Sequence, residues 1–252
     1  MPARPRVHCI ALLLGILAVG AAPKDRVDPA RAETRLRALG GHLDRDLNTR
    51  EIIEVRLNNR ALKDDDLRWL GPFPHIRALS VENTAIGDRA LAYISGLDGL
   101  EWLNLYQTKV SDIGLKHLIP LRTLQALHIG RTAVTDEGLK TIRQMTQLVV
   151  LGLRGTRVTD AGLPSLAALT SLESLNLSET SVSGRGLETL RVLPALGTLW
   201  LNHTPLDDSA VAALEQLTSL SEIHVTGTRI SGRGIDRLRD AKPGRLVVVD
   251  DR

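Results

Sequence analysis

The sequence predicts an α/β fold: a right-handed solenoid in a horseshoe arc, with a concave parallel β-sheet and short convex α-helices. Three observations predict it. Apolar residues recur every 24 residues from Ile52 to Val249 without insertion or deletion. Each unit combines an alternation of period two, typical of a short strand, with an apolar stripe at steps of three, typical of a short helix. The chain is 43% hydrophobic but only 2% aromatic, so its core must be aliphatic.

Residues 1–22 have the three-part layout of a secretory signal peptide. Arg4 and Arg6 form a basic start, an uncharged apolar run extends over Ile10–Ala22, and the last three residues of that run are small, which predicts cleavage there. As a helix the run would be roughly 20 Å long, shorter than the ~30 Å hydrocarbon core of a bilayer. We therefore expect the leader to be removed rather than retained as a membrane anchor, so that no stable membrane span remains.

The expected location of the mature chain is therefore secreted, periplasmic or in the cell envelope. The single cysteine, Cys9, lies in the leader, so the mature chain would hold no disulfide and no thiolate metal site. Without Arg4 and Arg6, 30 basic residues face 29 acidic ones, a net charge of +1. A nearly neutral body does not suit the phosphate backbone of a nucleic acid, so we expect no nucleic-acid partner.

Residues 23–51 are predicted to form an N-terminal cap. A helix is expected around Pro29–Leu39 and should end at Gly40-Gly41, because glycine is favoured just after a helix C-terminus. A short strand is expected over 42–46, followed by a turn into the first repeat. Such a cap would cover the apolar end that the first unit of a solenoid exposes.

Eight 24-residue units occupy residues 52–243, and a ninth strand within 244–252 is expected to act as a C-terminal capping strand. Leucine, isoleucine or valine occupies the first, fourth and sixth positions of the units. The fourth-position column is Val55, Leu79, Leu103, Leu127, Leu151, Leu175, Leu199, Ile223 and Val247. Nine strands at about 4.8 Å spacing give a sheet roughly 38 Å across, an open arc rather than a closed ring.

Three columns mark the turn between strand and helix. Threonines are expected to face inward, where their hydroxyls satisfy buried backbone groups: Thr84, Thr108, Thr132, Thr156, Thr180, Thr204 and Thr228. Aspartates one unit apart are expected to cap the helices rather than to hold calcium: Asp64, Asp88, Asp112, Asp136, Asp160 and Asp208. Glycines of the first helical turn are expected to allow close packing of neighbouring turns: Gly114, Gly138, Gly162, Gly186 and Gly234.

The turns of two central units have the sequences VTDEGL (134–139) and VTDAGL (158–163). Repeat length, apolar columns and this turn resemble the leucine-rich repeat family over residues 52–250. The segment RALGG (37–41) resembles the N-terminal caps of bacterial secreted or envelope leucine-rich repeat proteins, and the resemblance implies a binding scaffold. The repeat subtype is also similar to that of F-box adaptors, but residues 23–51 contain nothing like an F-box, so an F-box-like adaptor is a remote alternative.

Side chains that leave the strands on the open face are the candidates for ligand binding. The period of two places the third and fifth residues of each unit on the concave surface, with the seventh and eighth along its rim. Aromatic, histidine and arginine side chains on such a face are typical of binding surfaces. The candidates are Trp102, Asn104, Tyr106, His128, Arg131, Val150, Arg154, Asn176, Trp200, Asn202, His203 and His224. In the alternative interpretation, these side chains lie flat on one another and only cover neighbouring backbone.

These observations favour a non-catalytic scaffold that binds a protein or peptide on its concave sheet, as a monomer and without a cofactor. We expect no catalytic residues and no metal site: there is no Gly-x-Ser-x-Gly elbow and no His-Glu-x-x-His helix, and His203 and His224 are offset by roughly 10 Å along the strands. A glycan- or envelope-polymer-binding module is the principal alternative, because Trp102 and Trp200 can stack on sugar rings. A hydrolase with an unrecognised site is a more remote one.

Overall fold

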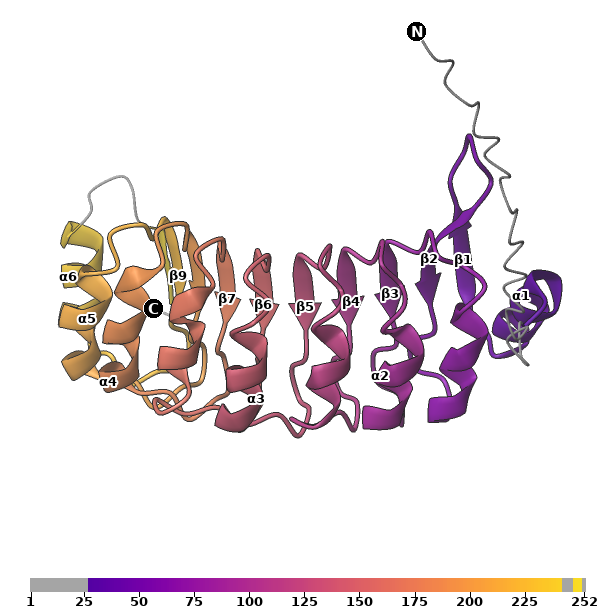
Figure 1. The fold of residues 1–252 in the computed structure, drawn as a ribbon. Helices are drawn as coiled ribbons and strands as arrows, with labels where there is room; N and C mark the ends of the chain where they lie inside the picture. Colours follow the sequence, from indigo (N-terminus) through magenta and orange to yellow (C-terminus); the bar gives the residue numbers. More distant parts are fainter. Residues whose placement is uncertain (1–26, 242–246, 251–252) are drawn as a thin grey trace, which may run out of the picture.

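The computed structural model describes residues 27–241 and 247–250, so the predicted leader at 1–22 lies outside the described residues. One ten-stranded sheet follows the chain order from β1 to β10, with the helical segments in a second row (Figure 1). The strands are β1 (His42–Arg45), β2 (Ile52–Arg56), β3 (Ala78–Ser80), β4 (Trp102–Asn104), β5 (Ala126–His128), β6 (Val150–Gly152), β7 (Ser174–Asn176), β8 (Thr198–Trp200), β9 (Glu222–His224) and β10 (Val247–Val249).

The sheet is parallel from β2 to β10, as the repeat predicts, whereas β1 pairs with β2 in the antiparallel sense. Leu43 lies opposite Val55 in this hairpin. A parallel connection needs a crossover of about a dozen residues or more, and the turn between β1 and β2 is too short for one. Asp46 shapes the turn by accepting hydrogen bonds from the backbone N–H groups of Asn48 and Thr49.

The parallel strands pair without any shift of register. Ala78, Trp102, Ala126 and Val150 are successive Cα partners across four neighbouring strands. A constant repeat length of 24 residues requires this, because each unit then returns the chain to an equivalent point one strand further along. Residues with the same position in the repeat therefore form straight rows across the sheet.

Helical segments close every unit on the convex side. Six are α-helices: α1 (Pro29–Ala38), α2 (Asp88–Ile94), α3 (Asp136–Ile142), α4 (Gly184–Leu187), α5 (Val211–Glu215) and α6 (Gly232–Ala241). Five are 3₁₀-helices: η1 (Asp64–Leu70), η2 (Gly114–Leu118), η3 (Leu163–Ala168), η4 (Glu188–Val192) and η5 (Asp208–Ala210). The predicted short convex helices are therefore present in every unit, some as α-helices and some as 3₁₀-helices. Apolar residues at steps of three occur in both kinds of unit, as at Leu163 and Leu166 in η3 and at Leu139 and Ile142 in α3, so this spacing does not choose between the two helix types.

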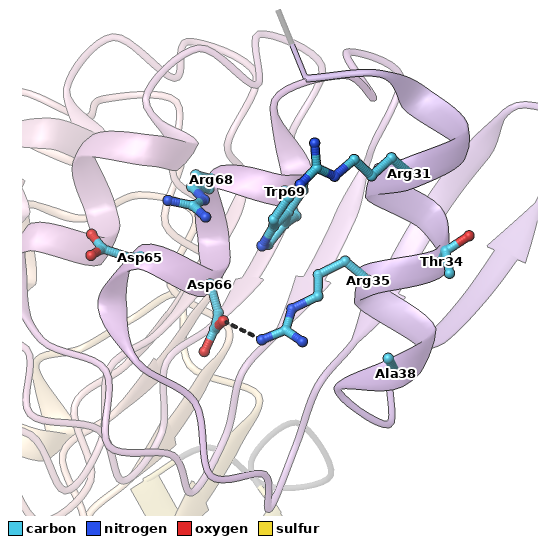
Figure 2. Close-up of a pocket in the computed structure, with 8 residues that line it drawn as sticks. All are labelled: Arg31, Thr34, Arg35, Ala38, Asp65, Asp66, Arg68 and Trp69. Atoms are coloured by element: carbon cyan, nitrogen blue, oxygen red, sulfur yellow. Dashed lines mark ion pairs between the residues drawn. The ribbon is translucent and has the colours of Figure 1, made fainter. Parts of the chain in front are cut away.

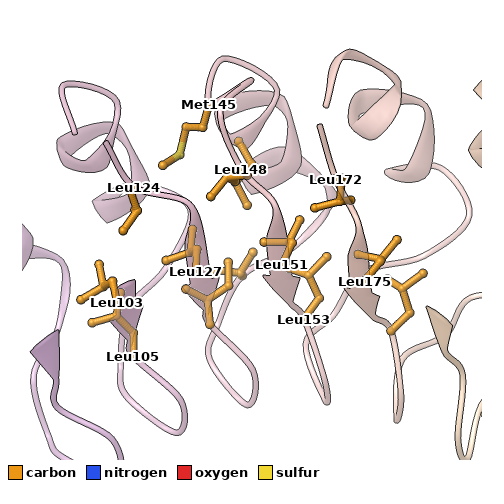
Figure 3. Close-up of a cluster of buried hydrophobic side chains, with 14 of the residues drawn as sticks. Leu103, Leu105, Leu124, Leu127, Met145, Leu148, Leu151, Leu153, Leu172 and Leu175 are labelled. Carbon is orange, nitrogen blue, oxygen red and sulfur yellow. The ribbon is translucent and has the colours of Figure 1, made fainter. Parts of the chain in front are cut away.

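Apolar side chains from strand, turn and helix form one continuous core along the solenoid (Figure 3). Leu127, Leu151 and Leu175, which follow one another across β5, β6 and β7, are 0% exposed. Burying one such side chain contributes about 1.5–3 kcal/mol. Helix α1 closes the N-terminal end of the core with Ala32 and Leu36, which are also fully buried.

The threonine column faces inward, as predicted. Its members from Thr84 to Thr204 are buried, and Thr228 in the last unit is half-buried. Every hydroxyl donates to the carbonyl oxygen three residues earlier, over distances of 2.6–2.8 Å. The column thus satisfies a backbone acceptor inside each turn that would otherwise lack a partner.

The aspartate row does not cap its own helices, and this prediction is wrong. Asp136 Oδ1 accepts the backbone N–H of Thr159 at 2.8 Å, and Oδ2 accepts the hydroxyl of the same residue at 2.7 Å. The same pair of bonds recurs at Asp88, Asp112 and Asp160. Local capping comes from the preceding hydroxyl, as where Thr135 accepts the N–H of Glu137. The aspartates tie neighbouring units together.

The glycine column leaves room for these carboxylates. A Cβ at Gly162 would lie 2.3 Å from Asp136 Oδ1, and the equivalent distances are 2.4–2.5 Å at Gly114, Gly138 and Gly186. The predicted close packing of turns is therefore packing of glycine against the aspartate of the preceding unit. At one junction both residues are exchanged: Gly184 stands in the aspartate row and Ala210 in the glycine column, and a Cβ at Gly184 would lie 2.8 Å from the Cα of Ala210.

Candidate binding face on the concave sheet

The open face of the sheet is formed by alternate side chains of the three-residue strands. In β4, β5, β7, β8 and β9 the first and third side chains are half-buried and the second is buried. In β6, Leu151 is buried, Val150 is half-buried and Gly152 has no side chain. The predicted division between inward and outward positions is therefore confirmed in these strands, and the predicted candidates in them lie on the open face, whereas the outward-row Ser80 of β3 is buried.

Two tryptophan–histidine pairs lie on this face, at separate places. Trp102 in β4 contacts His128 in β5, with ring centres 5.7 Å apart and planes tilted by 56°. Trp200 in β8 stacks on His224 in β9, with ring centres 5.4 Å apart and planes at 21°. Aromatic pairs at such distances stabilise one another by about 0.5–1.5 kcal/mol. Each indole is thus held against the next unit while remaining half-buried.

The two histidines have different electrostatic surroundings. Burial lowers the pKa of His128 below its usual value of 6.5, and the charge of Glu82 opposes this shift only in part. His128 is therefore neutral at pH 7. His224 Nε2 lies 2.7 Å from Glu222 Oε1. This contact fixes the orientation of the imidazole that is stacked on Trp200.

An ion cluster on the rim lies between the two pairs. Arg131 Nη2 donates to Glu179 Oε2 at 3.0 Å, and Arg154 donates through Nε and Nη2 to Glu179 Oε1. The guanidinium of Arg131 also lies 6.0 Å from the ring centre of Tyr106, within the range of a cation–π contact. Hydrogen bonds from Arg154 and Arg131 lower the pKa of Glu179 to about 2, so this carboxylate stays ionised at neutral pH. The cluster links three consecutive units.

The eighth residue of every unit holds the left-handed backbone conformation, which favours glycine. Gly155 and Gly227 hold it in two units. In the others it is held by Asn59, Asn83, Gln107, Arg131, Glu179 and His203, with φ between 50° and 58°. Because the conformation recurs in all eight units, it belongs to the architecture of the repeat.

Bulky side chains of this face fold over glycines of the next unit. A Cβ at Gly152 would lie 2.9 Å from His128 Nδ1, and one at Gly130 would lie 2.8 Å from Cδ2 of Tyr106. Two further pairs have the same relation: Arg131 with Gly155 and His203 with Gly227. The alternative interpretation is therefore right in part, because these side chains do cover neighbouring backbone. The same packing holds them in place on the open face.

The asparagines among the candidates serve the fold. Their Oδ1 atoms accept backbone N–H groups at 2.9–3.0 Å: Asn104 from Tyr106, Asn176 from Ser178 and Asn202 from Thr226. Asn104 also donates through Nδ2 to Glu82 Oε2 at 3.0 Å. These amides hold the turns that follow the strands, so their presence on the open face has a structural cause.

Two carboxylates of this face, Glu179 and Glu222, are not among the predicted binding candidates. Both occupy positions that the repeat marks as outward-facing, the eighth and the third of their units. These two acids orient Arg131, Arg154 and His224, a role that the aromatic and cationic character of a binding surface does not predict. Their place in the repeat was the signal that could have found them.

A separate cleft of about 690 Å³ lies between α1 and η1, at the N-terminal end of the solenoid. Figure 2 shows Trp69 beside Arg31 and Arg68, whose guanidinium carbons lie 5.7 and 4.9 Å from the ring centre. Arg35 of α1 pairs with Asp66 of η1 at 3.8 Å. Trp69 itself is only 8% exposed. These contacts dock the N-terminal helix on the first repeat, so the cleft borders the cap and is remote from the concave face.

Two features of other site classes are missing from the described residues 27–241 and 247–250. No three histidine, cysteine, aspartate or glutamate side chains converge as they would around a metal ion. The longest helices described, α1 and α6, have ten residues each, and no helix described has the length and apolar character that crossing a bilayer requires.

Comparison with known proteins agrees with this architecture. Internalin C2 from Listeria monocytogenes is 21% identical with a TM-score of 0.64, and the match covers 88% of this chain and 93% of that one. A second internalin (inlF) of the same organism is 19% identical with a TM-score of 0.61, covering 87% of this chain and 63% of that one. At these identities the likeness shows the fold alone. The sequence matches no curated protein. A family model described as "Leucine-rich repeat region" matches residues 53–246, so the chain belongs to the leucine-rich repeat family.

Proposed function

We propose that this chain is a non-catalytic, monomeric scaffold that binds a protein or peptide on its concave sheet face, in a secreted or cell-envelope location. One observation carries the proposal. Both tryptophan–histidine pairs lie on the open face of the sheet, in a chain with only one Phe, two Tyr and three Trp. Aromatic anchors amid polar side chains are typical of protein-binding surfaces.

The anchors are held in place by contacts within the solenoid. Trp102 and Trp200 each pack against a histidine of the next unit, and His128 in turn lies over Gly152. Immobilising a free side chain on binding costs about 0.5–1.5 kcal/mol. Because these rings are already ordered by their neighbours, a partner would lose less of its binding free energy to side-chain ordering.

The spacing of the anchors suits an extended segment. Trp102 and Trp200 lie on strands four places apart, which corresponds to about 19 Å at the usual strand spacing. The third-position row between them is made of small or apolar residues, among them Ala126, Val150 and Ser174, and the fifth-position row beside it holds His128, Gly152 and Asn176. An extended chain rises about 3.3 Å per residue, so about six residues would reach from one anchor to the other. A peptide or a loop of a folded partner fits this distance.

A glycan or envelope polymer is a second candidate, favoured by the geometry of one pair. The planes of Trp200 and His224 are inclined by only 21°, and an aromatic surface of this kind can stack on a sugar ring. Glu222, which contacts His224, is 42% exposed and could accept hydrogen bonds from sugar hydroxyls. The experiment below separates the two candidates.

Affinity purification of partners from the envelope fraction of the native cells tests the proposal. Trp102→Ala and Trp200→Ala should each weaken capture of the purified partner by about thirtyfold, the effect of losing an anchor worth about 2 kcal/mol. Both variants should remain folded and lose only about 0.5–1.5 kcal/mol of unfolding free energy, the contribution of one ring pair, because neither ring is in the core. The control is Lys140→Ala on α3, whose side chain is 64% exposed and pairs only with Glu137 among the described residues.

Two outcomes would contradict the proposal. Binding to a sugar polymer that is lost in both tryptophan variants, with no protein captured, would assign the face to glycans. Loss of capture in Lys140→Ala, with normal capture by both tryptophan variants, would move the binding surface to the convex side.

A further inference from the structure

The middle of the concave face carries a small excess of positive charge. From β4 to β8, the third, fifth, seventh and eighth positions of the units hold three charged side chains, Arg131, Arg154 and Glu179. With histidine counted as neutral, this stretch has a net charge of +1. Its other side chains are aromatic, amide, hydroxyl or aliphatic, so the arginines define its electrostatic character.

The ion cluster of Arg131, Arg154 and Glu179 has more unused hydrogen-bond donors than unused acceptors. Both carboxylate oxygens of Glu179 already accept bonds from the arginines. Each guanidinium has five N–H donors, of which Arg131 uses one and Arg154 two. Their side chains are 48% and 46% exposed, and no second carboxylate among the described residues lies within 4.0 Å of either. The cluster therefore has many unused donors, whereas Glu179 already uses three of its roughly four acceptor sites.

We propose that the concave face selects an extended acidic segment of a protein partner, with a carboxylate bound by Arg131 and Arg154 between apolar anchors at the two tryptophan–histidine pairs. This inference rests on the proposed function. Guanidinium groups bind carboxylates through paired, charge-assisted hydrogen bonds, which a lysine or an amide cannot reproduce. A cationic side chain of a partner would meet a net positive charge and find both oxygens of Glu179 occupied.

The surface beside the arginines favours a polypeptide over an acidic polysaccharide. Ala126, Val150 and Gly152 line the middle of the sheet and have no side-chain hydrogen-bonding group. A sugar chain carries hydroxyl groups along its length, and burying them against such a surface without partners is unfavourable. An extended peptide can instead turn apolar side chains toward the sheet and direct alternate ones toward the rim.

Display of random peptides against the full chain tests this inference. Peptides of about twelve residues are twice as long as the stretch that joins the anchors. We expect selected peptides to be enriched in aspartate or glutamate, and replacement of that acid by its amide to weaken binding about tenfold. We also expect affinity for the acidic peptide to fall as the salt concentration rises, because the arginines are exposed to solvent.

Variants of the cluster provide the matched measurements. Glu179→Gln removes the internal competitor for the guanidinium groups, so the acidic peptide should bind several-fold more tightly. The neutral triple variant Arg131→Gln/Arg154→Gln/Glu179→Gln should bind the acidic peptide and its amide version equally. Arg185→Gln in α4, an exposed arginine away from the concave face, should preserve the preference.

The outcomes separate failure of this inference from failure of the proposed function. Peptides that require Trp102 for binding but show no preference for acids would refute the acidic partner and leave the binding face intact. Tight binding of a uronic acid oligosaccharide that requires both Trp102 and the arginines, without an acidic preference among peptides, would reassign the cluster to an anionic glycan. If no peptide and no purified partner required Trp102, the proposed function and this inference would both be refuted.

Discussion

The double variant Asp136→Gly/Gly162→Ala should lose less stability than the sum of the losses in the two single variants. Gly162→Ala places a methyl carbon 2.3 Å from Asp136 Oδ1, a distance at which the carboxylate must move. Overpacking of this kind costs about 1–3 kcal/mol, and the smaller conformational entropy of alanine in the unfolded chain offsets about 0.4–1 kcal/mol, since the φ of −81° at Gly162 is open to alanine. Asp136→Gly removes two hydrogen bonds to Thr159 and leaves its half-buried N–H without its partner, at a cost of about 1–3 kcal/mol.

The double variant reproduces an arrangement that the chain already contains at Gly184 and Ala210, where the alanine lies against the glycine and no carboxylate is present. In that arrangement the methyl group introduced by Gly162→Ala has room, so the steric cost should disappear and only the loss of the hydrogen bonds should remain. We therefore expect the double variant to be about as stable as Asp136→Gly alone, with a coupling energy of about 1–2 kcal/mol.

The first junction shows the condition for this coupling. In the unit after Asp64, Ala90 stands in the glycine column. Asp64 binds Gly87 of that unit, which has no hydroxyl. The carboxylate there accepts one bond, from the backbone N–H at 2.7 Å, instead of the two bonds that a serine or threonine donates at the equivalent junctions. A steric conflict between an alanine methyl group and the aspartate is therefore expected where a serine or threonine binds both carboxylate oxygens.

Equilibrium urea unfolding of the four proteins, followed by circular dichroism, measures the coupling. Additive losses within about 0.5 kcal/mol would refute the reasoning, because they would mean that the methyl group and the carboxylate do not compete for space. In that additive case the loss of stability in the double variant equals the sum of the losses in the two single variants.

Three further predictions concern the core, the rim and the leader. Thr156→Val, which removes a buried hydroxyl, should lower the free energy of unfolding by about 1–3 kcal/mol, and Thr228→Val, which is half-buried, should cost less; equal and negligible losses in denaturant melts would contradict the inward assignment. Glu179 has a lowered pKa, so its stabilisation is complete above the ordinary value of 4.5 and is lost as the pH falls toward about 2. Because its arginine partners are half exposed, we expect Glu179 to account for only about 1 kcal/mol of the stability lost between about pH 6 and pH 2, measured as the difference in that loss between the unaltered chain and Glu179→Gln. Native protein should lack about the first 21 residues, and N-terminal sequencing that begins at Met1 would contradict the predicted signal peptide.

The candidate site shows how far position in the repeat can predict contacts. Outward-facing residues such as Trp102 and Trp200 were predicted correctly as lying on the open face, because a period of two and a constant repeat length determine the face of every residue. Their pairing with His128 and His224 was not predicted, since it depends on the rotamers that each ring adopts over the next unit. The same limit hid Glu179, whose importance comes from partners 25 and 48 residues earlier in the chain.

By itself, the sequence determined the solenoid, the sheet and the core, because these follow from a 24-residue period that repeats without interruption. The periodicity within a unit places its apolar residues on one face of the strand and of the helix. Stacking of similar units then leaves one arrangement that buries all of these faces. Only the tertiary structure decided what the polar columns do. Asp136 was expected to bind its own helix and instead binds Thr159 in the next unit, 23 residues away. Hydrogen bonds between units depend on the distance and angle at which neighbouring turns stack, and no pattern within a single unit contains that geometry.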